Sequence, residues 1–273
     1  MTSITAVPDR AILAYYDAIA PKILPFLKDR RVAVRHHFDT AIVFRRHEHV
    51  GKKKVWITIE TKEKLLALVH QHGYEFFPHL EGDCDFWFAL DIDIRAVPLE
   101  LGKLVVRETT RVLEERRVKF LLSFSGGNGF HIRWAFPQLT ARDVPKGPWP
   151  FLRGVVRNLQ QEVERRLQRS TRRDAFYRHI PRGDPITELN AMDKRAQKSV
   201  LFDELILKPT ATIRAPFSLH MGKRLVAVPL SPHALPAFLP ERHATPAAAR
   251  KLRAVRIPKS SVATFLDHPL WRG

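Results

Sequence analysis

The segment Asp85–Asp93 reads Asp-Phe-Trp-Phe-Ala-Leu-Asp-Ile-Asp. Its apolar run from Phe86 to Leu90 predicts a buried strand that ends in two carboxylates one residue apart. Because alternate side chains of a strand point to one face, Asp91 and Asp93 should project together, about 7 Å apart along the strand. Two carboxylates this close repel each other unless a cation lies between them, and oxygen ligands of this kind suit Mg²⁺ or Mn²⁺ held against substrate phosphates. The alternative is a strand that simply leaves the core and meets water at a polar end.

A second segment, Leu122–His131, reads Leu-Ser-Phe-Ser-Gly-Gly-Asn-Gly-Phe-His. Strands are predicted over residues 120–124 and 130–136, joined by a glycine-rich turn made of Ser125, Gly126, Gly127, Asn128 and Gly129. Such turns let backbone N–H groups approach an anion closely, and His131 follows at once, placed to donate to a phosphate. The alternative is an ordinary β-hairpin, since Asn-Gly is a strong hairpin signal. Together the two segments predict a metal site beside a phosphate cradle.

Composition limits the class of protein. The chain has 273 residues, 45% of them hydrophobic, which is enough for one large domain or two small ones. No apolar run reaches the roughly 18 residues of a membrane span, and no secretory signal is apparent. The single cysteine, Cys84, excludes an internal disulfide and a multi-cysteine zinc finger, and fits the reducing cytoplasm. We therefore expect a cytoplasmic protein with no membrane partner.

Charge indicates the partner. Lys and Arg total 46 against 28 Asp and Glu, a formal net charge of +18. An excess of this size favours a polyanionic partner, most often nucleic acid, over a surface that is basic only for solubility. A basic cluster near the N-terminus is the first candidate to contact a nucleic-acid backbone. It comprises Arg45, Arg46, Lys52, Lys53 and Lys54. The neighbouring histidines are not at a recognised zinc-ligand spacing, so a metal role for them is the weaker reading.

Periodicity predicts alternating helices and strands without internal repeats. Helices are expected at residues 9–27, 62–71, 99–116, 151–167 and 247–252, and further strands at 32–35, 41–46, 55–59 and 226–230. Residues 137–150 are proline-rich and read as a surface connection, and residues 170–199 read as irregular, with a polar tail at 193–198. Residues 266–273 show no clear pattern.

Three signals stand in order along the chain: Asp-Ile-Asp, then Ser-Gly-Gly-Asn-Gly-Phe-His, then an isolated Asp203 ahead of Arg-Ala-Pro-Phe-Ser-Leu-His. This order resembles the archaeo-eukaryotic primase–polymerase superfamily. The chain is most similar there to the polymerase domain of bacterial ligase D and its stand-alone relatives. The opening Tyr15-Tyr16-x-x-Ile19-Ala20-Pro21 and Glu75-x-x-Pro78 also look like that family, so the likeness covers residues 15–230.

Two positions depart from the family pattern. Lysine is usual where Asn128 stands, and arginine where His220 stands; the primases have histidine at the second. Arg46 or one of Lys52 to Lys54 is a candidate to supply the missing positive charge. The zinc-binding cysteines common in primase small subunits are absent, which argues against that branch.

The resemblance implies an α/β (α+β) fold, with an RRM-like antiparallel catalytic sheet and an N-terminal αβ layer. It implies a single catalytic domain over residues 1–273, with the N-terminal layer over about 1–80, the core over 81–232 and a C-terminal tail over 233–273. It also implies nucleotidyl transfer, with Mg²⁺ or Mn²⁺ held by Asp91, Asp93 and Asp203. The triphosphate would be bound by the turn from Ser125 to Gly129 and by His131, Arg214, Ser218, His220 and Lys223.

Three functions compete. The first is a template-dependent polymerase that extends ends or fills gaps in DNA break repair. It would act on 5′-phosphorylated ends or gaps, together with a separate DNA ligase and an end-binding protein. The second is a primase that starts strands de novo from nucleoside triphosphates. The third is a basic nucleic-acid-binding module with a dead catalytic site. Retention of three acidic positions argues against the third, because buried carboxylates are costly without a cation.

Overall fold

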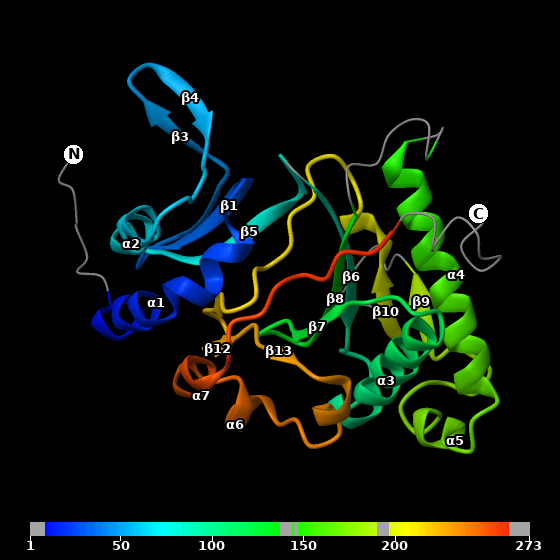
Figure 1. Cartoon of the computed structure of the whole chain (residues 1–273). Coiled ribbons are helices and arrows are strands. Elements are labelled where there is room, and N and C mark those ends of the chain that lie inside the picture. Colours follow the sequence, from blue (N-terminus) through cyan, green and yellow to red (C-terminus); the bar gives the residue numbers. More distant parts are fainter. Residues whose placement is uncertain (1–8, 84, 137–143, 145–146, 190–196, 262–273) are drawn as a thin grey trace.

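The computed structural model describes residues 9–83, 85–136, 144, 147–189 and 197–261 (Figure 1). Most of the polar tail predicted at 193–198, and the terminal residues 266–273, lie outside the described residues. Among those described, no helix combines the length and the hydropathy that crossing a membrane requires.

Helices and strands alternate along most of the chain. The helices are α1 (Arg10–Ile23), α2 (Lys62–His70), α3 (Leu99–Glu115), α4 (Pro148–Gln168), α5 (Arg173–Phe176), α6 (Pro240–His243) and α7 (Pro246–Lys251). The strands are β1 (Arg30–His37), β2 (Ile42–Arg45), β3 (His47–Val50), β4 (Lys53–Trp56), β5 (Gly73–Gly82), β6 (Phe86–Asp93), β7 (Leu121–Phe124), β8 (Gly129–Phe136), β9 (Thr187–Leu189), β10 (Val200–Asp203), β11 (Leu219–His220), β12 (Leu225–Val226) and β13 (Pro229–Leu230). Short 3₁₀ turns follow α1 (Leu24–Phe26) and β10 (Glu204–Ile206) and precede α6 (Pro232–Ala234).

Nine of the described strands form one sheet, and β3 with β4 and β11 with β12 form two separate hairpins. The path of the nine-stranded sheet is β13-β7-β8-β6-β5-β1-β2, and β10 pairs with β6 and β9 beside that path. Every pairing is antiparallel except that of β9 with β10. The mixed α+β fold with a largely antiparallel sheet confirms the predicted fold class.

Strand β6 holds the centre of the sheet. Along one edge it pairs with β8 over its whole length, from Phe86 opposite Phe136 to Asp93 opposite Gly129. Its other edge is shared: β5 meets its first residue, and β10 meets its last three. The carboxyl end of β6 therefore lies between β8 and β10, which is where Asp91 and Asp93 stand.

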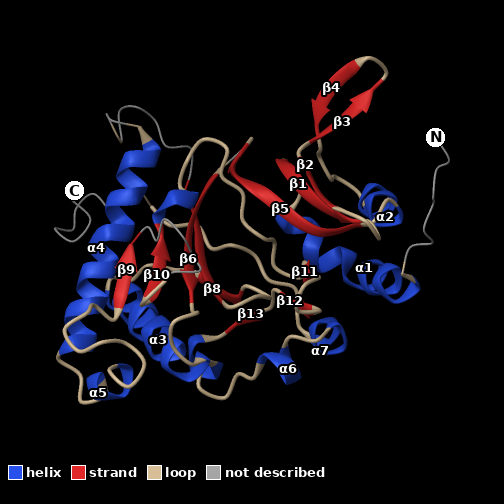
Figure 2. Cartoon of the chain, turned by 180° about the vertical axis from the view of Figure 1, so that it is seen from behind, coloured by secondary structure: helices blue, strands red, loops and turns tan. Residues whose placement is uncertain are grey.

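Helices α3 and α4 pack together and cover one face of this central region (Figures 1 and 2). The even-numbered side chains of β6 point to that face. Phe88 stacks on Trp134 at 3.9 Å between ring centroids, and a Cβ on Gly102 of α3 would lie only 2.3 Å from Ile94. The odd-numbered side chains of β6, which include Asp91 and Asp93, consequently face away from α3.

The N-terminal layer is built from β1, β2 and β5 with α1 and α2. Side-chain oxygens satisfy the first free N–H groups of both helices: Asp9 accepts from Ala11 and Ile12, and Thr61 accepts from Lys64. The β3–β4 hairpin stands away from the rest of this layer (Figure 1).

Most predicted elements are confirmed, and five are corrected. The strand predicted at 55–59 is β4, which covers Lys53–Trp56. Helix α4 begins at Pro148, inside the segment predicted as a surface connection, because proline suits the first turn of a helix. The segment predicted as irregular contains α5 and β9. The strand predicted at 226–230 is two short strands, β12 and β13. Strand β5 was not predicted, because its buried residues do not alternate with polar ones.

The C-terminal segment up to residue 261 packs against the rest of the protein. Helix α7 contacts α1, and Lys22 donates to the Arg250 carbonyl at 2.5 Å. Further on, Ala135 of β8 exchanges backbone hydrogen bonds with Pro258 and Ser260. The proposed division into an N-terminal layer, a core and a tail stays a prediction.

Candidate active site

A row of polar side chains crosses the sheet near the carboxyl end of β6. Asp91 lies directly opposite Asp203 on β10 and opposite His131 on β8, and His131 in turn lies opposite Ser123 on β7. Directly paired residues share a face and have Cβ atoms about 4.5–5.5 Å apart. The sheet register therefore brings Asp203 beside Asp91, although the two are distant in sequence, and Asp93 follows two residues along the same face.

Above this row lies an open cavity of about 420 Å³. Asp91 and Asp93 form part of its floor, and the turn after β7 contributes Ser125, Gly127 and Asn128. Its basic and imidazole side chains come from five separate parts of the chain: Arg35, Arg95, His131, Arg214, and His220 with Lys223. A site that places carboxylates against several cations suits a ligand rich in phosphate oxygens with bound divalent ions.

The glycine-rich turn is held by Ser125. Its Oγ accepts from the N–H groups of Gly127 at 3.1 Å and Gly129 at 3.2 Å. Gly129 has no room for a side chain, because a Cβ there would lie 2.0 Å from the carbonyl oxygen of Ile92. The His220 ring lies against the same turn, 3.1 Å from where a Cβ of Gly127 would be. The turn and His220 thus form one wall of the cavity.

Glu75 on β5 organises a second group of cavity residues. It is buried, and it accepts from His37 Nε2 at 2.8 Å, Arg35 Nη1 at 3.1 Å and the backbone N–H of Met221 at 3.2 Å, and from Arg214. Burial alone would raise the pKa of this carboxyl, but the charges of Arg214 and Arg35 outweigh burial and lower it. Ionised Glu75 therefore holds two arginines of the cavity in place.

Arg133 fixes the tautomer of His131. This arginine is fully buried, and its Nη2 lies 2.7 Å from His131 Nδ1. A guanidinium can only donate, so Nδ1 accepts and the ring proton is on Nε2, which lies 3.4 Å from Asp91 Oδ1. Burial, and next the charge of Arg133, lower the pKa of His131 to about 4. At neutral pH His131 is therefore uncharged and directs its N–H at Asp91.

The family model described as "LigD, primase-polymerase domain" matches residues 10–256. The chain belongs to this family. The resemblance inferred from its motifs is confirmed.

Among solved structures, this primase–polymerase domain is similar to the polymerase domain from Mycobacterium tuberculosis Ligase D in complex with DNA. The TM-score is 0.64 at 14% sequence identity, and the match covers 92% of each chain. At that identity the likeness shows the shared fold. The search of curated proteins found no match.

The donor set of this primase–polymerase domain fits a hard divalent cation. Asp91, Asp93 and Asp203 offer only carboxylate oxygens, the ligands that Mg²⁺ and Mn²⁺ prefer. Mg²⁺ is commonly held by one or two carboxylates together with substrate phosphates, and the Asp91–Asp93 pair is of that kind. One oxygen of Asp203 accepts from the Leu205 N–H at 3.0 Å. Within the described residues, no group of three or more His, Cys, Asp and Glu is arranged to hold an ion by itself.

Several residues predicted from the sequence do not line the cavity. Asp203 is one of them: it is 5% exposed and is paired with Asp91, which does line it. Ser218 is fully buried, and its Oγ accepts from the Phe76 N–H at 2.8 Å, so it joins the segment after β10 to β5. Gly126 and Gly129 support the turn from behind. Arg45 and Arg46, and the exposed Lys52, Lys53 and Lys54 at the tip of the β3–β4 hairpin, lie outside the lining. Their contact with nucleic acid stays a prediction.

Two charged residues of the cavity were missed. Arg95 continues the alternation of Asp91 and Asp93 to a third position, so the spacing could have indicated it. Arg35 has no local signal, because it reaches the cavity only through the pairing of β1 with β5, where it lies opposite Glu75. The positive charge expected from Arg46 or Lys52 to Lys54 is thus replaced in the lining by Arg35 and Arg95.

The lowered pKa of His131 makes stability depend on pH. Its pKa falls from 6.5 to about 4 on folding, so between these values the unfolded chain binds a proton that the folded protein does not. The free energy of unfolding should therefore fall as the pH drops from 6.5 to about 4, by up to about 1.4 kcal/mol per pH unit for this group. Denaturant titrations across this range measure the free energy of unfolding at each pH. In His131→Gln this free energy should depend less steeply on pH than in wild type, by the contribution of His131. The exposed His233→Gln serves as control and should keep the wild-type slope; equal slopes in all three proteins would contradict the assignment.

Proposed function

We propose that this chain is a template-dependent nucleotidyltransferase of the primase–polymerase type, which extends nucleic-acid ends or fills gaps in DNA break repair. The observation that carries the proposal is the pairing of Asp203 with Asp91. Asp91 and Asp93 line the cavity together with its cations, and Asp203 is buried directly beside Asp91. Membership of the LigD primase–polymerase family supports the same chemistry.

The proposed reaction joins the 3′-hydroxyl oxygen of a primer to the α-phosphorus of a nucleoside triphosphate and releases pyrophosphate. Asp91, Asp93 and Asp203 would hold Mg²⁺ or Mn²⁺, which when bound lowers the pKa of the hydroxyl and neutralises charge on the phosphates. The neutral His131 keeps its N–H on Asp91 and so holds that carboxylate in one orientation.

The triphosphate would lie along the cationic wall. Arg35 and Arg214 present guanidinium groups that Glu75 holds in place, and charge-assisted hydrogen bonds to phosphate oxygens are among the stronger polar contacts. Lys223 and Arg95 are exposed at the cavity and add charge that can follow the leaving pyrophosphate. The Ser125–Gly129 turn and His220 would also border the triphosphate.

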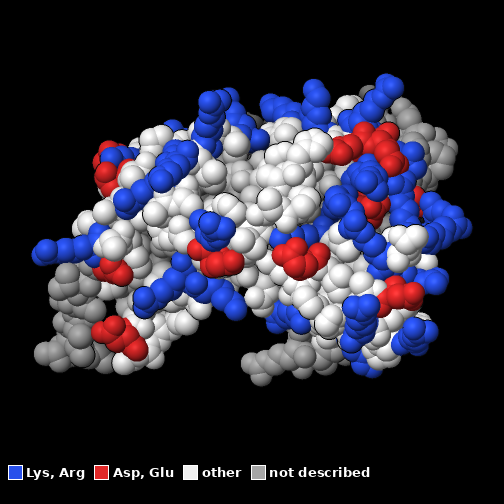
Figure 3. All heavy atoms as spheres, turned by 90° about the horizontal axis from the view of Figure 1, so that it is seen from below, with Lys and Arg blue, Asp and Glu red and all other residues white. Residues whose placement is uncertain are grey.

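DNA is the proposed macromolecular substrate. The similar Mycobacterium domain was solved in complex with DNA, and this chain carries a net charge of +18. Figure 3 shows Lys and Arg side chains spread over one face of the molecule, where they outnumber Asp and Glu. Such a surface binds the phosphate backbone without reading sequence. A separate ligase and an end-binding protein are proposed partners in repair.

A primer-extension assay tests the function. On a primed template with Mg²⁺ or Mn²⁺ and all four nucleoside triphosphates, we expect products longer than the primer, and none when the ions are chelated. Gapped DNA with a 5′-phosphate should be filled at least as well as an open template. Products made without a primer would identify a primase instead. Tight DNA binding with no extension under any of these conditions would leave only a binding module.

A further inference from the structure

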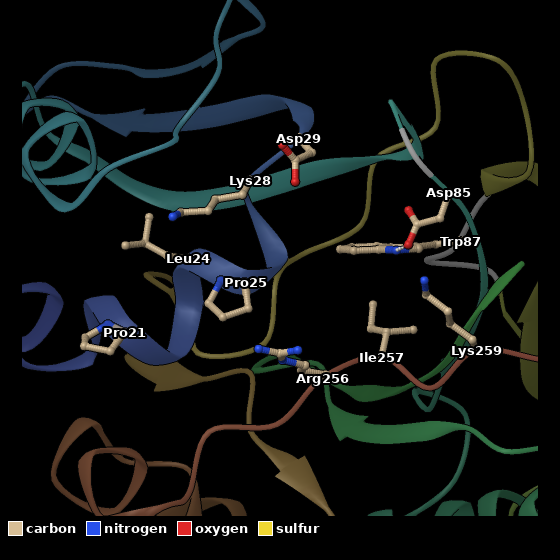
Figure 4. Close-up of a pocket in the computed structure, with 10 residues that line it drawn as sticks. All are labelled: Pro21, Leu24, Pro25, Lys28, Asp29, Asp85, Trp87, Arg256, Ile257 and Lys259. Carbon is tan, nitrogen blue, oxygen red and sulfur yellow. Dashed lines mark hydrogen bonds between the residues drawn. The ribbon is translucent and has the colours of Figure 1, made fainter. Parts of the chain in front are cut away.

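A second cavity, of about 500 Å³, opens at the other end of β6 (Figure 4). Apolar side chains of the first helix and the turn after it form one side, namely Pro21, Leu24 and Pro25. Trp87 of β6 and Ile257 of the C-terminal segment form another. The volume falls within the roughly 300–1,000 Å³ of pockets that bind a nucleotide-sized ligand.

This cavity lies on the same face of the sheet as the carboxylates. Trp87 precedes Asp91 by an even number of residues, so both side chains point to one face. Trp87 is paired with Ala135, and Ala135 forms a bridge with Lys259. Figure 4 shows Lys259 beneath Trp87, its amino group directed towards the indole. At the rise of a strand, Trp87 is about 13 Å from Asp91 along β6.

The charge of the cavity is positive. Its Asp85 is already paired, because it forms an ion pair with Arg30 and accepts from Trp87 Nε1 at 3.3 Å. The other charged residues of the lining are one carboxylate, Asp29, and three cations, Lys28, Arg256 and Lys259. These three cations are exposed, and none of their side chains makes a hydrogen bond or ion pair with another described residue.

We propose that this cavity binds backbone phosphates of the nucleic-acid strand whose end occupies the carboxylate site. The inference rests on the proposed function, since that function supplies the strand. Three cations around one opening complement a phosphodiester, and the proline and tryptophan walls accept the sugar and base between two phosphates. A free small anion would not need the apolar walls.

The spacing sets where the contact falls on the DNA. Phosphates of one strand of B-DNA are about 3.4 Å apart along the helix axis, so about 13 Å corresponds to about four nucleotides. The cavity therefore contacts the strand about four nucleotides from the reacting position. A duplex shorter than that should lose the contact.

The test compares the salt dependence of DNA binding, without nucleotide, in three full-length proteins. One is wild type, and one is the triple variant Lys28→Ala, Arg256→Ala, Lys259→Ala. The third removes the same charge from exposed arginines around α5: Arg172→Ala, Arg178→Ala, Arg182→Ala. Each neutralised phosphate contributes about 0.9 to the magnitude of the slope of log K against log salt. The slope of the cavity variant should therefore be smaller in magnitude than that of wild type by about 2–3. The α5 variant should keep the wild-type slope.

Phosphate neutralisation locates the contact. Methylphosphonate placed about four nucleotides from the reacting end should weaken binding of wild type about tenfold and leave the cavity variant unchanged. The charge-keeping variant Lys28→Arg, Arg256→Lys, Lys259→Arg should bind as wild type, which excludes misfolding as the cause. Equal slopes in wild type and the cavity variant, or equal losses in the cavity and α5 variants, would overturn the proposal. Because the readout is binding alone, an inactive wild-type enzyme would refute the proposed function and not this site.

Discussion

Asp91→Ala should reduce primer extension by about 10³-fold or more while DNA binding stays within about twofold of wild type. The carboxylate lies at the centre of the polar row, between Asp203 and His131, so its loss removes the donor that the divalent ions would share. DNA affinity comes mainly from backbone phosphates contacted by Lys and Arg, and these contacts remain. Single-turnover extension with saturating nucleotide measures the first effect, and fluorescence anisotropy with labelled DNA measures the second.

Asp93→Ala and Asp203→Ala should give losses of similar size, because the proposed site uses the three carboxylates as a unit. Asp174→Ala is the matched control, since it removes an exposed carboxylate from α5, away from the cavity. If Asp91→Ala extended primers at the wild-type rate, the carboxylate row would not be the active site. If only Asp203→Ala remained active, the third position would be the one misassigned.

Glu75→Ala should lower the free energy of unfolding by about 3–5 kcal/mol, because it leaves buried cations without their counter-charge. The side chain is 1% exposed and accepts hydrogen bonds from Arg35, His37 and Arg214. Chemical denaturation at neutral pH measures the loss. Where enough folded protein remains, the KM for nucleotide should rise more than kcat falls, because both arginines that Glu75 holds face the proposed triphosphate site.

Glu75→Gln separates shape from charge in this network. It keeps the size of the side chain and one acceptor oxygen, so its stability should lie between wild type and Glu75→Ala. Glu81→Ala on the same strand is the control. Because Glu81 is exposed, its substitution should change the free energy of unfolding by little. A Glu75→Ala protein as stable as the Glu81→Ala protein would show that the network contributes nothing.

Local patterns predicted the parts of the site that lie within one strand or one turn. The alternation at Asp91 and Asp93 and the glycines after Phe124 follow from period-two spacing and turn chemistry, and both segments have the predicted form. Asp203 carried no local signal, and only the order of motifs in a known family indicated it. The register of β10 on β6 then places it beside Asp91.

Features that depend on pairing between distant strands could not be predicted. Glu75 and Arg35 meet because β1 and β5 pair in one register, which hydrophobic spacing does not specify when both strands are buried. Ser218 illustrates the opposite error. It lies in a motif that resembles a nucleotide-binding segment, yet its hydroxyl joins two backbone segments inside the protein.

Strand β10, which carries Asp203, is attached to the centre of the sheet by few residue pairs. It is four residues long and is held to β6 by three residue pairs, while β6 and β8 share eight. Detachment of this short strand would leave the pairing of β6 with β8 in place and still remove Asp203. Loss of the proposed active site and global unfolding are therefore expected to be separate events, and heat or mild denaturant should abolish primer extension before the protein unfolds.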